Sequence, residues 1–200
     1  MRKLVLAALA ASALASPAFA QDEVAPFTGF RAEGVVGYDT MSDGTDGDAG
    51  SSDGVTYGGA IGYDVQLGGA VIGAEAELTG SSVDTRADSL LTAGDRLRVD
   101  MGRDIYLGGR IGAAITPTTL IYAKGGYTNA RIDTVYETPT TRTDISEDME
   151  GYRLGAGAEF KLSNNMYLKG EYRYSNYGSI DGYDIDIDRH QVVAGVGVRF

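Results

Sequence analysis

Side chains of two kinds alternate along the last twelve residues of this chain. The apolar positions are Val192, Ala194, Val196, Val198 and Phe200; between them stand Arg189, Gln191, Gly195, Gly197 and Arg199, with Val193 as the one apolar exception. Because successive side chains of a β-strand point to opposite faces, this pattern predicts a strand with one apolar face and one small or charged face. The two faces of such a strand require different surroundings.

The same alternation recurs in seven earlier segments. They are 27–38, 55–65, 70–80, 97–115, 120–131, 152–162 and 166–177. Short connections rich in Gly, Pro, Thr and Asn, which are typical of turns, lie at 66–69, 116–119 and 163–165. Longer polar connections lie at 39–54, 81–96, 132–151 and 178–188. Eight strands joined in this way predict an all-β fold, an eight-stranded antiparallel up-and-down β-barrel.

The hydropathy of the chain indicates how such a barrel could cross a membrane. No segment after the first twenty residues contains an apolar run long enough for a transmembrane helix. A closed barrel also crosses a bilayer, because its backbone hydrogen bonds are all made between strands, and only one face of each strand must then be apolar. We therefore expect a transmembrane β-barrel with three short periplasmic turns and four long extracellular loops.

The distribution of charge indicates which face of the strands meets lipid. The polar faces carry ten cations and eight anions: Arg31, Arg98, Arg110, Lys124, Arg153, Lys161, Lys169, Arg173, Arg189 and Arg199, with Glu33, Asp64, Glu75, Glu77, Asp100, Asp104, Glu159 and Glu171. The whole chain has a formal net charge of −11, so the acidic excess lies in the connections. Cationic and anionic side chains in nearly equal numbers can pair with one another within the narrow lumen of an eight-stranded barrel. A soluble calyx with its apolar face inward is the alternative.

Aromatic side chains of the apolar faces fall at two heights along the expected strands. Phe30, Tyr63, Phe160 and Phe200 lie near the short turns, and Tyr38, Tyr57, Tyr127, Tyr152 and Tyr174 lie near the long connections. Two aromatic girdles mark the two interfaces of a membrane. The girdles therefore favour the lipid-facing assignment of the apolar faces over the calyx.

The first twenty residues have the features of a secretory signal peptide. Arg2 and Lys3 precede a mostly apolar segment at 4–14, and the Ala-Phe-Ala sequence at 18–20 is typical of a cleavage site. We expect cleavage after Ala20 and a single mature domain at 21–200; an uncleaved anchor is disfavoured because the apolar segment is too short to span a bilayer.

Charge and cysteine content narrow the function of the mature domain. Cleavage would remove two positive charges and change the formal net charge from −11 to −13, which argues against a nucleic-acid partner. The chain contains no cysteine, so disulfides and thiolate metal sites are excluded.

Three segments of the chain resemble a known family. The sequences at 151–160 and 168–174 and the terminal Val-Gly-Val-Arg-Phe at 196–200 are similar to the OmpA-like outer-membrane β-barrel domain family, which includes opacity-type and porin-family surface proteins of Gram-negative bacteria. The resemblance implies an integral outer-membrane protein with a structural, adhesive or weakly conducting role.

The same resemblance implies particular partners for the protein. They are outer-membrane lipid, lipopolysaccharide and, during biogenesis, the barrel assembly machinery, whose recognition signal the terminal Phe200 resembles. We expect a monomer, and we expect no peptidoglycan-binding domain after Phe200.

The residues that could support catalysis or metal binding are few. His190 is the single histidine, and no serine lies two positions from it, so we predict no catalytic site, although a few eight-stranded barrels are enzymes that modify lipid A. Asp184, Asp186 and Asp188 alternate like calcium ligands but lack the Gly and Glu of an EF-hand. We therefore expect no cofactor and interpret these aspartates as a solvated rim, with loose divalent-cation binding as the alternative.

The interior charges allow two interpretations. They form either a closed ion-pair network or the lining of a narrow pore, and near balance of sign favours the network because buried charges need partners. We expect fifteen of the eighteen charged side chains to form it, all but Asp64, Arg98 and Arg189.

Pairing about the turn at 116–119 brings two arginines of the lipid-facing set together. These are Arg103 and Arg131, near the ends of their strands that face the long loops. Because the planar guanidinium of arginine can bind two phosphate oxygens, we hypothesise that the pair binds a lipopolysaccharide phosphate. Two arginines that are merely solvated beyond the bilayer are the alternative.

The sequence therefore predicts a protein that maintains the integrity of the membrane and displays its loops at the cell surface. An adhesin or receptor that binds a host or surface ligand through its four loops is the second possibility, and a small porin is the third.

Overall fold

A computed structural model of the chain describes residues 25–43, 52–82, 84–88, 96–137, 142–178 and 187–200. Within these ranges the strands are β1 (Gly29–Asp43), β2 (Ser52–Leu67), β3 (Ala70–Ser81), β4 (Asp84–Asp88), β5 (Arg96–Thr116), β6 (Thr119–Glu137), β7 (Arg142–Lys161), β8 (Met166–Gly178) and β9 (Ile187–Arg199). The described residues contain no helix that is both long and apolar enough to cross a membrane. The eight expected strands are present, and the short β4 is additional.

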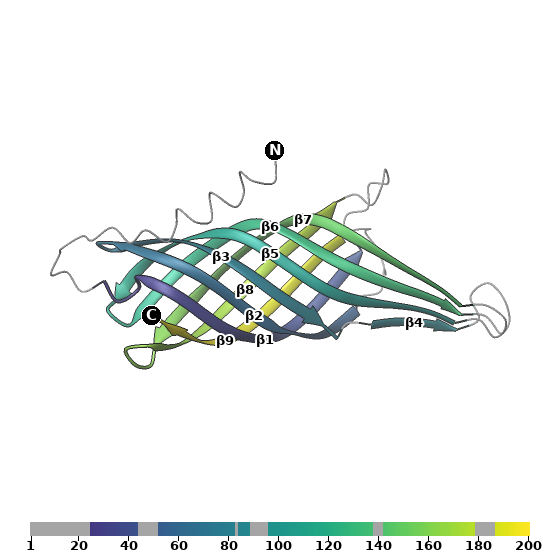
Figure 1. The fold of residues 1–200 in the computed structure, drawn as a ribbon, viewed down its shortest axis with the longest axis horizontal. Helices are drawn as coiled ribbons and strands as arrows, with labels where there is room; N and C mark the ends of the chain where they lie inside the picture. Colours follow the sequence, from purple (N-terminus) through teal and green to yellow (C-terminus); the bar gives the residue numbers. More distant parts are fainter. Residues whose placement is uncertain (1–24, 44–51, 83, 89–95, 138–141, 179–186) are drawn as a thin grey trace.

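Eight of the strands close into an antiparallel barrel (Figure 1). Neighbours in sequence pair with one another, β1 pairs with β9, and β3 pairs with β5 to complete the ring. The short β4 pairs with β5 alone among the described strands and lies outside the ring. The predicted eight-stranded up-and-down barrel is therefore confirmed.

The three short turns lie at one end of the barrel, together with the C-terminus (Figure 1). Leu67 pairs with Ala70, and Gly68 between them has a φ of 61°, a left-handed conformation that glycine adopts without strain. Thr116 pairs with Thr119 around Pro117 in the second turn. All three turns lie where the sequence placed them.

At the other end the strands are longer than the sequence pattern indicated. Most of the expected loop 132–151 is strand, because β6 continues to Glu137 and β7 begins at Arg142. The sequence Ile-Asp-Thr-Val-Tyr at 132–136 is rich in the β-branched and aromatic residues that favour strands. The expected loop 81–96 likewise contains β4, and β1 and β2 extend into 39–54. Most of the loop expected at 178–188 lies outside the described residues.

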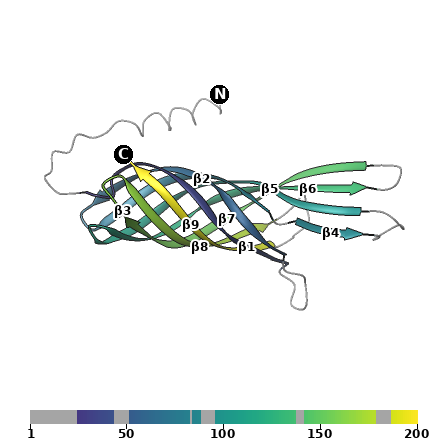
Figure 2. The same cartoon turned by 90° about the horizontal axis from the view of Figure 1, so that it is seen from below.

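Three consecutive strands extend past the rest of the barrel (Figure 2). The pairing of β3 with β5 ends at Gly80 and Arg103, and the pairing of β7 with β8 ends at Glu150 and Gly178. Beyond these points β6 continues to pair with β5 on one side and with β7 on the other, and β5 pairs with β4. We call this extension, formed by β4 and residues 96–101, 132–137 and 142–147, the projecting sheet.

A β-bulge lies where β5 enters the projecting sheet. Met101 pairs with Ile132 and Asp104 pairs with Ala130, so β5 advances three residues while β6 advances two. An extra residue reverses which face the following positions occupy. On the far side of this bulge, Asp100 pairs with Asp133. The side chains of Asp100 and Arg98 lie outside the described part of the structure.

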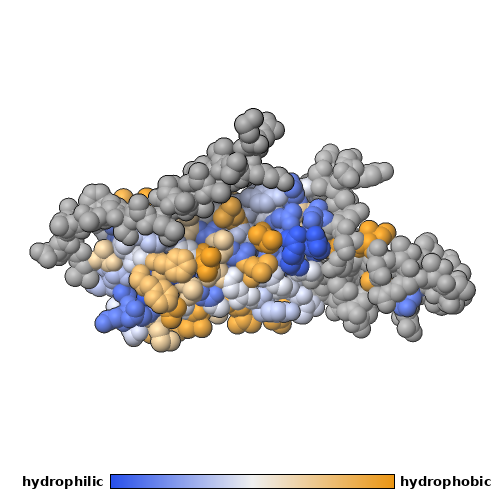
Figure 3. Space-filling model, in the orientation of Figure 1, coloured by the Kyte–Doolittle hydropathy of each residue, from blue (hydrophilic) through white to orange (hydrophobic). Residues whose placement is uncertain are grey.

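The outer wall of the barrel is apolar and the lumen is polar, as expected for a barrel in lipid. Exposed positions on the wall include Leu107, Ile111, Leu154 and Val192, and Figure 3 shows apolar residues on the face of the barrel that it presents. The aromatic side chains of both predicted girdles lie on the same wall; Phe30, Tyr63, Phe160 and Phe200 lie at the short-turn end, and Tyr38, Tyr57, Tyr127, Tyr152 and Tyr174 at the opposite end. An apolar surface of this extent requires an apolar environment.

Candidate functional site

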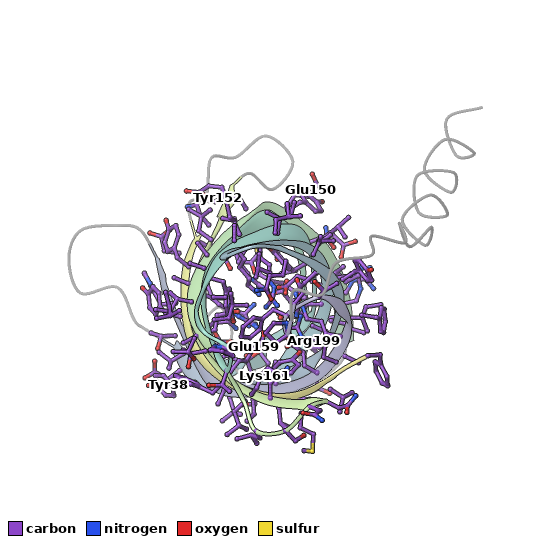
Figure 4. The ribbon with its side chains drawn as sticks, turned by 90° about the vertical axis from the view of Figure 1, so that its left-hand side faces the viewer. Tyr38, Glu150, Tyr152, Glu159, Lys161 and Arg199 are labelled. Atoms are coloured by element: carbon purple, nitrogen blue, oxygen red, sulfur yellow. The ribbon has the colours of Figure 1, made fainter. Side chains whose placement is uncertain are left out.

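The lumen holds sixteen buried charged side chains of balanced sign. The eight cations are Arg31, Arg110, Lys124, Arg153, Lys169, Arg173, Arg189 and Arg199, and the eight anions are Glu33, Asp39, Asp64, Glu75, Glu77, Asp104, Glu159 and Glu171. Figure 4, a view along the barrel, shows the nitrogen- and oxygen-bearing side chains inside the ring of strands and carbon-rich side chains outside it. We call these sixteen residues the lumen network.

At the short-turn end, two arginines surround two carboxylates. Arg110 of β5 donates from Nε and Nη2 to the two oxygens of Asp64 at 2.8 and 2.5 Å. Arg199 of β9 donates to Asp64 at 2.8 Å and to Glu159 of β7 at 2.6 Å. The Arg110 guanidinium also reaches Glu159 at 3.1 Å, so the four side chains form a closed cycle between strands that are not neighbours.

The middle of the network is centred on a lysine and a glutamate. Lys124 Nζ lies 2.6 Å from Glu75, 2.8 Å from Glu171 and 3.6 Å from Glu77. Arg173 donates to both oxygens of Glu77 at 2.7 Å each, the two-point geometry that strengthens an arginine–carboxylate pair. Each charge here therefore has several partners.

Arg31 connects the middle of the network to the short-turn end. Its guanidinium pairs with Glu75 in the middle and lies 3.2 Å from Asp64. It also lies 3.4 Å from Glu33, which forms a further ion pair with Lys169. Arg31 is therefore a bridge between two groups of ion pairs.

The remaining members lie toward the long-connection end. Arg189 donates to Asp39 at 2.8 and 2.5 Å and to Asp104 at 2.6 Å. Arg153 pairs with Asp104 and lies 3.2 Å from Glu77, which joins this group to the middle. The sequence pattern assigned Asp39 to a loop, but β1 continues to Asp43, and alternation then points Asp39 into the lumen.

These contacts connect all sixteen residues into one network. Transferring a charge from water into a protein costs several kcal/mol unless partners compensate for the lost hydration. A connected, balanced network provides that compensation for every member and joins opposite walls of the barrel. The energetic value of each charge therefore depends on the presence of the others.

Four tyrosines fill the space between the charged groups. Tyr122 donates to Glu171 at 2.6 Å, Tyr167 to Glu33 at 2.7 Å and Tyr177 to Asp104 at 3.0 Å. The Lys124 ammonium lies 4.7 Å from the centre of the Tyr106 ring. The sequence did not single out Tyr106, Tyr167 or Tyr177, although inward glycines leave room for such rings: a Cβ at Gly108 would overlap the Tyr106 ring.

An apolar cluster lies at each end of the lumen network. Phe27, Val71, Leu120 and Tyr122 pack together at the short-turn end. Lys161 lies there too, 3.0 Å from the carbonyl oxygen of Pro26, and within the described residues no ion pair joins it to the lumen network. Ala130, Met149 and Tyr177 form the cluster at the other end.

On the outer wall, the structure brings Arg103 and Arg131 together around an aspartate. Arg131 donates from Nε to Asp148 at 2.9 Å and from Nη2 at 3.2 Å, and Arg103 Nη2 lies 3.5 Å from the same carboxylate. The hydrogen bond from Arg131 lowers the pKa of Asp148 below its ordinary value. The predicted proximity of the two arginines is therefore present, and Asp148 was not anticipated.

The single histidine lies on the outer wall among tyrosines. Its Nδ1 is 2.7 Å from the Tyr172 hydroxyl, and its ring lies 5.2 Å from that of Tyr174. Ser175 of the adjacent strand is buried in the lumen and donates no hydrogen bond to His190 in the described structure, where its hydroxyl accepts one from Arg153. Asp184 and Asp186 lie outside the described residues, within which no cluster of potential metal ligands is found.

Comparison with known proteins agrees with this geometry. Over 153 residues the chain is 33% identical to the 22 kDa outer membrane protein of Rhizobium leguminosarum, covering 72% of this chain and 66% of that protein. It is 29% identical over 165 residues to the 31 kDa outer-membrane immunogenic protein of Brucella melitensis, covering 73% of this chain and 68% of that protein.

Among solved structures, Neisserial surface protein A shares the fold. The TM-score is 0.57 at 14% identity, covering 86% of this chain and 98% of that protein. The family described as the outer membrane protein beta-barrel domain matches residues 6–200. The chain therefore belongs to the outer membrane protein beta-barrel domain family and is an integral β-barrel of the Gram-negative outer membrane.

Proposed function

We propose that the protein is a structural and surface-display barrel whose lumen is closed to solutes and which catalyses no reaction. The single observation that supports this proposal is the connected, buried and sign-balanced lumen network of eight cations and eight anions. A solute would have to separate ion pairs whose charges would then lie unpaired in a poorly solvated lumen. The apolar clusters at both ends add a barrier to water entry.

The lysines of the chain make this proposal testable. After Ala20 the chain contains three, of which Lys124 and Lys169 are buried in the lumen and Lys161 is partly exposed at its end. A water-soluble amine-reactive reagent applied to the folded protein in detergent is expected to modify Lys161 and the N-terminus only, as read by peptide mass spectrometry. Unfolded protein, in which all three lysines react, is the control. Rapid modification of Lys124 and Lys169 in folded protein would contradict a closed lumen, as would stable open channels in planar bilayers.

We also propose the route by which the chain reaches the membrane. Export through a signal peptide cut after Ala20 predicts Gln21 as the first residue of the mature protein, measurable by intact mass. Phe200, exposed on the wall beside Phe30, would carry recognition by the barrel assembly machinery. A Phe200→Ala variant is expected to accumulate unfolded in the periplasm, whereas Phe30→Ala is expected to assemble. By this route we expect the short turns to lie in the periplasm and the projecting sheet to lie outside the cell.

A second candidate function, binding of a surface ligand, is favoured by the projecting sheet. Residues 142–149 of β7 pair with β6, and within the described residues they have no strand on their other side. An unpaired edge can accept an extended peptide of another protein as an additional strand. Deleting 133–146 and joining Ile132 to Glu147, its partner in register, through an Asn-Gly turn would remove most of this edge and leave the barrel intact.

Cells that display the deletion variant are expected to lose adhesion to immobilised matrix proteins if the edge binds a ligand. Heat-dependent gel mobility of the variant controls for barrel folding. Undiminished adhesion by the correctly folded variant would eliminate this second function.

A further inference from the structure

Two arginines and one aspartate converge on the outer wall from three adjacent strands. Arg103 comes from β5, Arg131 from β6 and Asp148 from β7. Both guanidiniums reach the Asp148 carboxylate, Arg131 through two nitrogens at 2.9 and 3.2 Å and Arg103 through Nη2 at 3.5 Å. Arg103 also donates to Asn129 at 3.3 Å, which orients its side chain. Two cations therefore converge on a shared carboxylate.

The position of this cluster corresponds to the boundary of the membrane. Tyr127 of the aromatic girdle lies two positions before Asn129 on β6. The exposed Ile105 lies two positions after Arg103 on β5, and both side chains are on the same wall as the cluster. The projecting sheet begins on the other side of the cluster. Figure 3 shows a hydrophilic patch between the apolar wall and the strands that leave it. Lipid headgroups occupy this level on a membrane-embedded barrel.

The cluster is open to the surroundings of the barrel. The side chains of Arg103, Arg131 and Asp148 retain 36%, 40% and 43% of their exposure. Gly80, which pairs with Arg103 on β3, adds no side chain beside it. In contrast to the lumen network, this ion pair can exchange its anion without burying an unpaired charge.

We propose that Arg103 and Arg131 bind a phosphate monoester of a lipid headgroup, which takes the place of the Asp148 carboxylate. A phosphate monoester carries more negative charge than a carboxylate and offers three oxygens, so it can accept from both guanidiniums at once. Asp148 keeps the arginines positioned and competes with the ligand. The phosphate chemistry is independent of membrane orientation; assignment to lipopolysaccharide in the outer leaflet rests on the proposed function.

The test measures binding of lipid A to the refolded full-length mature protein in neutral detergent micelles. The probes are lipid A bearing both phosphates, the same lipid after enzymatic dephosphorylation, and inorganic phosphate as a competitor. The main variant is Arg103→Gln with Arg131→Gln. The matched control is Arg96→Gln with Arg98→Gln, which makes the same change of charge on the projecting part of β5.

The expected result is tighter binding of phosphorylated than of dephosphorylated lipid A, and an affinity loss of about tenfold or more in the main variant, because two charge-assisted contacts are removed. The control variant is expected to bind as the native protein does. The Asp148→Asn variant is expected to bind more tightly, since the competing carboxylate is gone. This opposite sign separates ligand binding from misfolding, which weakens binding in every variant.

Three outcomes would overturn the proposal. The first is equal affinity for the two lipids, and the second is undiminished binding by the main variant. The third is displacement of the lipid by inorganic phosphate at equal concentration, which would mean that the site recognises free phosphate and not a headgroup. None of these outcomes bears on closure of the lumen, which amine labelling tests separately.

Discussion

The same chemical pair has different consequences inside the barrel and on its wall. Arg153 in the lumen and Arg131 on the wall each pair with aspartate, but the Arg153 side chain is fully buried whereas 40% of Arg131 is exposed. When one partner of a lumen pair is removed, the remaining charge stays buried and no water takes the place of the lost partner. On the wall, water or another anion can take that place. Burial therefore makes the lumen pairs structural, whereas the wall pair is partly exposed to the surroundings of the barrel.

The largest expected effect follows removal of a carboxylate that serves several cations. Glu77→Gln would leave Lys124, Arg153 and Arg173 with one fewer anion and is expected to lower the free energy of unfolding by about 3–5 kcal/mol. Urea unfolding of the folded protein in detergent, followed by tyrosine fluorescence, measures this change. The exposed Glu137→Gln on the projecting sheet is the control, with an expected change within about 0.5 kcal/mol. Equal effects of the two substitutions would refute the contrast between lumen and surface.

A smaller effect on stability is expected when a methyl group is added on the lumen side of a strand, compared with the outer side. In Gly108→Ala the added methyl group would meet the Tyr106 ring and the backbone of Gly125, and we expect a loss of about 1–3 kcal/mol from overpacking. Gly170→Ala, where no atom lies within 4 Å of the added carbon, is the matched control and is expected to be neutral. The same unfolding measurement applies. A neutral Gly108→Ala would mean that the lumen can expand to accommodate a methyl group.

The wall pair is expected to contribute little to stability. Arg131→Ala should lower the free energy of unfolding by no more than about 1 kcal/mol, because exposed ion pairs are screened by solvent. Arg153→Ala is the buried counterpart, and its expected loss is several times larger for the reason given for Glu77. A large loss in Arg131→Ala would mean that the wall cluster holds the projecting sheet in place and is not free to exchange its anion.

The smallest effect is the pH dependence of the wall pair. Because the hydrogen bond from Arg131 lowers the pKa of Asp148 in the folded protein, the pair stabilises the fold above the ordinary aspartate pKa of about 3.9 and loses this contribution as pH falls through the lowered value. The coupling energy between Arg131→Ala and Asp148→Asn, measured by unfolding at neutral and at acidic pH, should therefore decrease on acidification. A coupling energy that increased toward acid pH would contradict a lowered pKa of Asp148 in the folded protein.

Part of the lumen network was accessible from the sequence. Alternation identified the inward positions of most charges, including Arg31, Glu75 and Lys124, because strand geometry is local. It failed for Asp39, whose strand continues past the expected end, and it did not predict the bulge between Met101 and Asp104. Strand ends and bulges depend on pairing with neighbouring strands, which a single strand does not encode.

Two-sided strands, short turns and balanced inward charge by themselves determined that this chain folds as a membrane barrel. Only the tertiary structure decided which charges meet: Arg199 with Glu159, Arg189 with Asp104, and two arginines around Asp148. The physical reason is distance. Alternation is set by the geometry of each residue, whereas contacts across a lumen depend on the closure, tilt and stagger of all eight strands together.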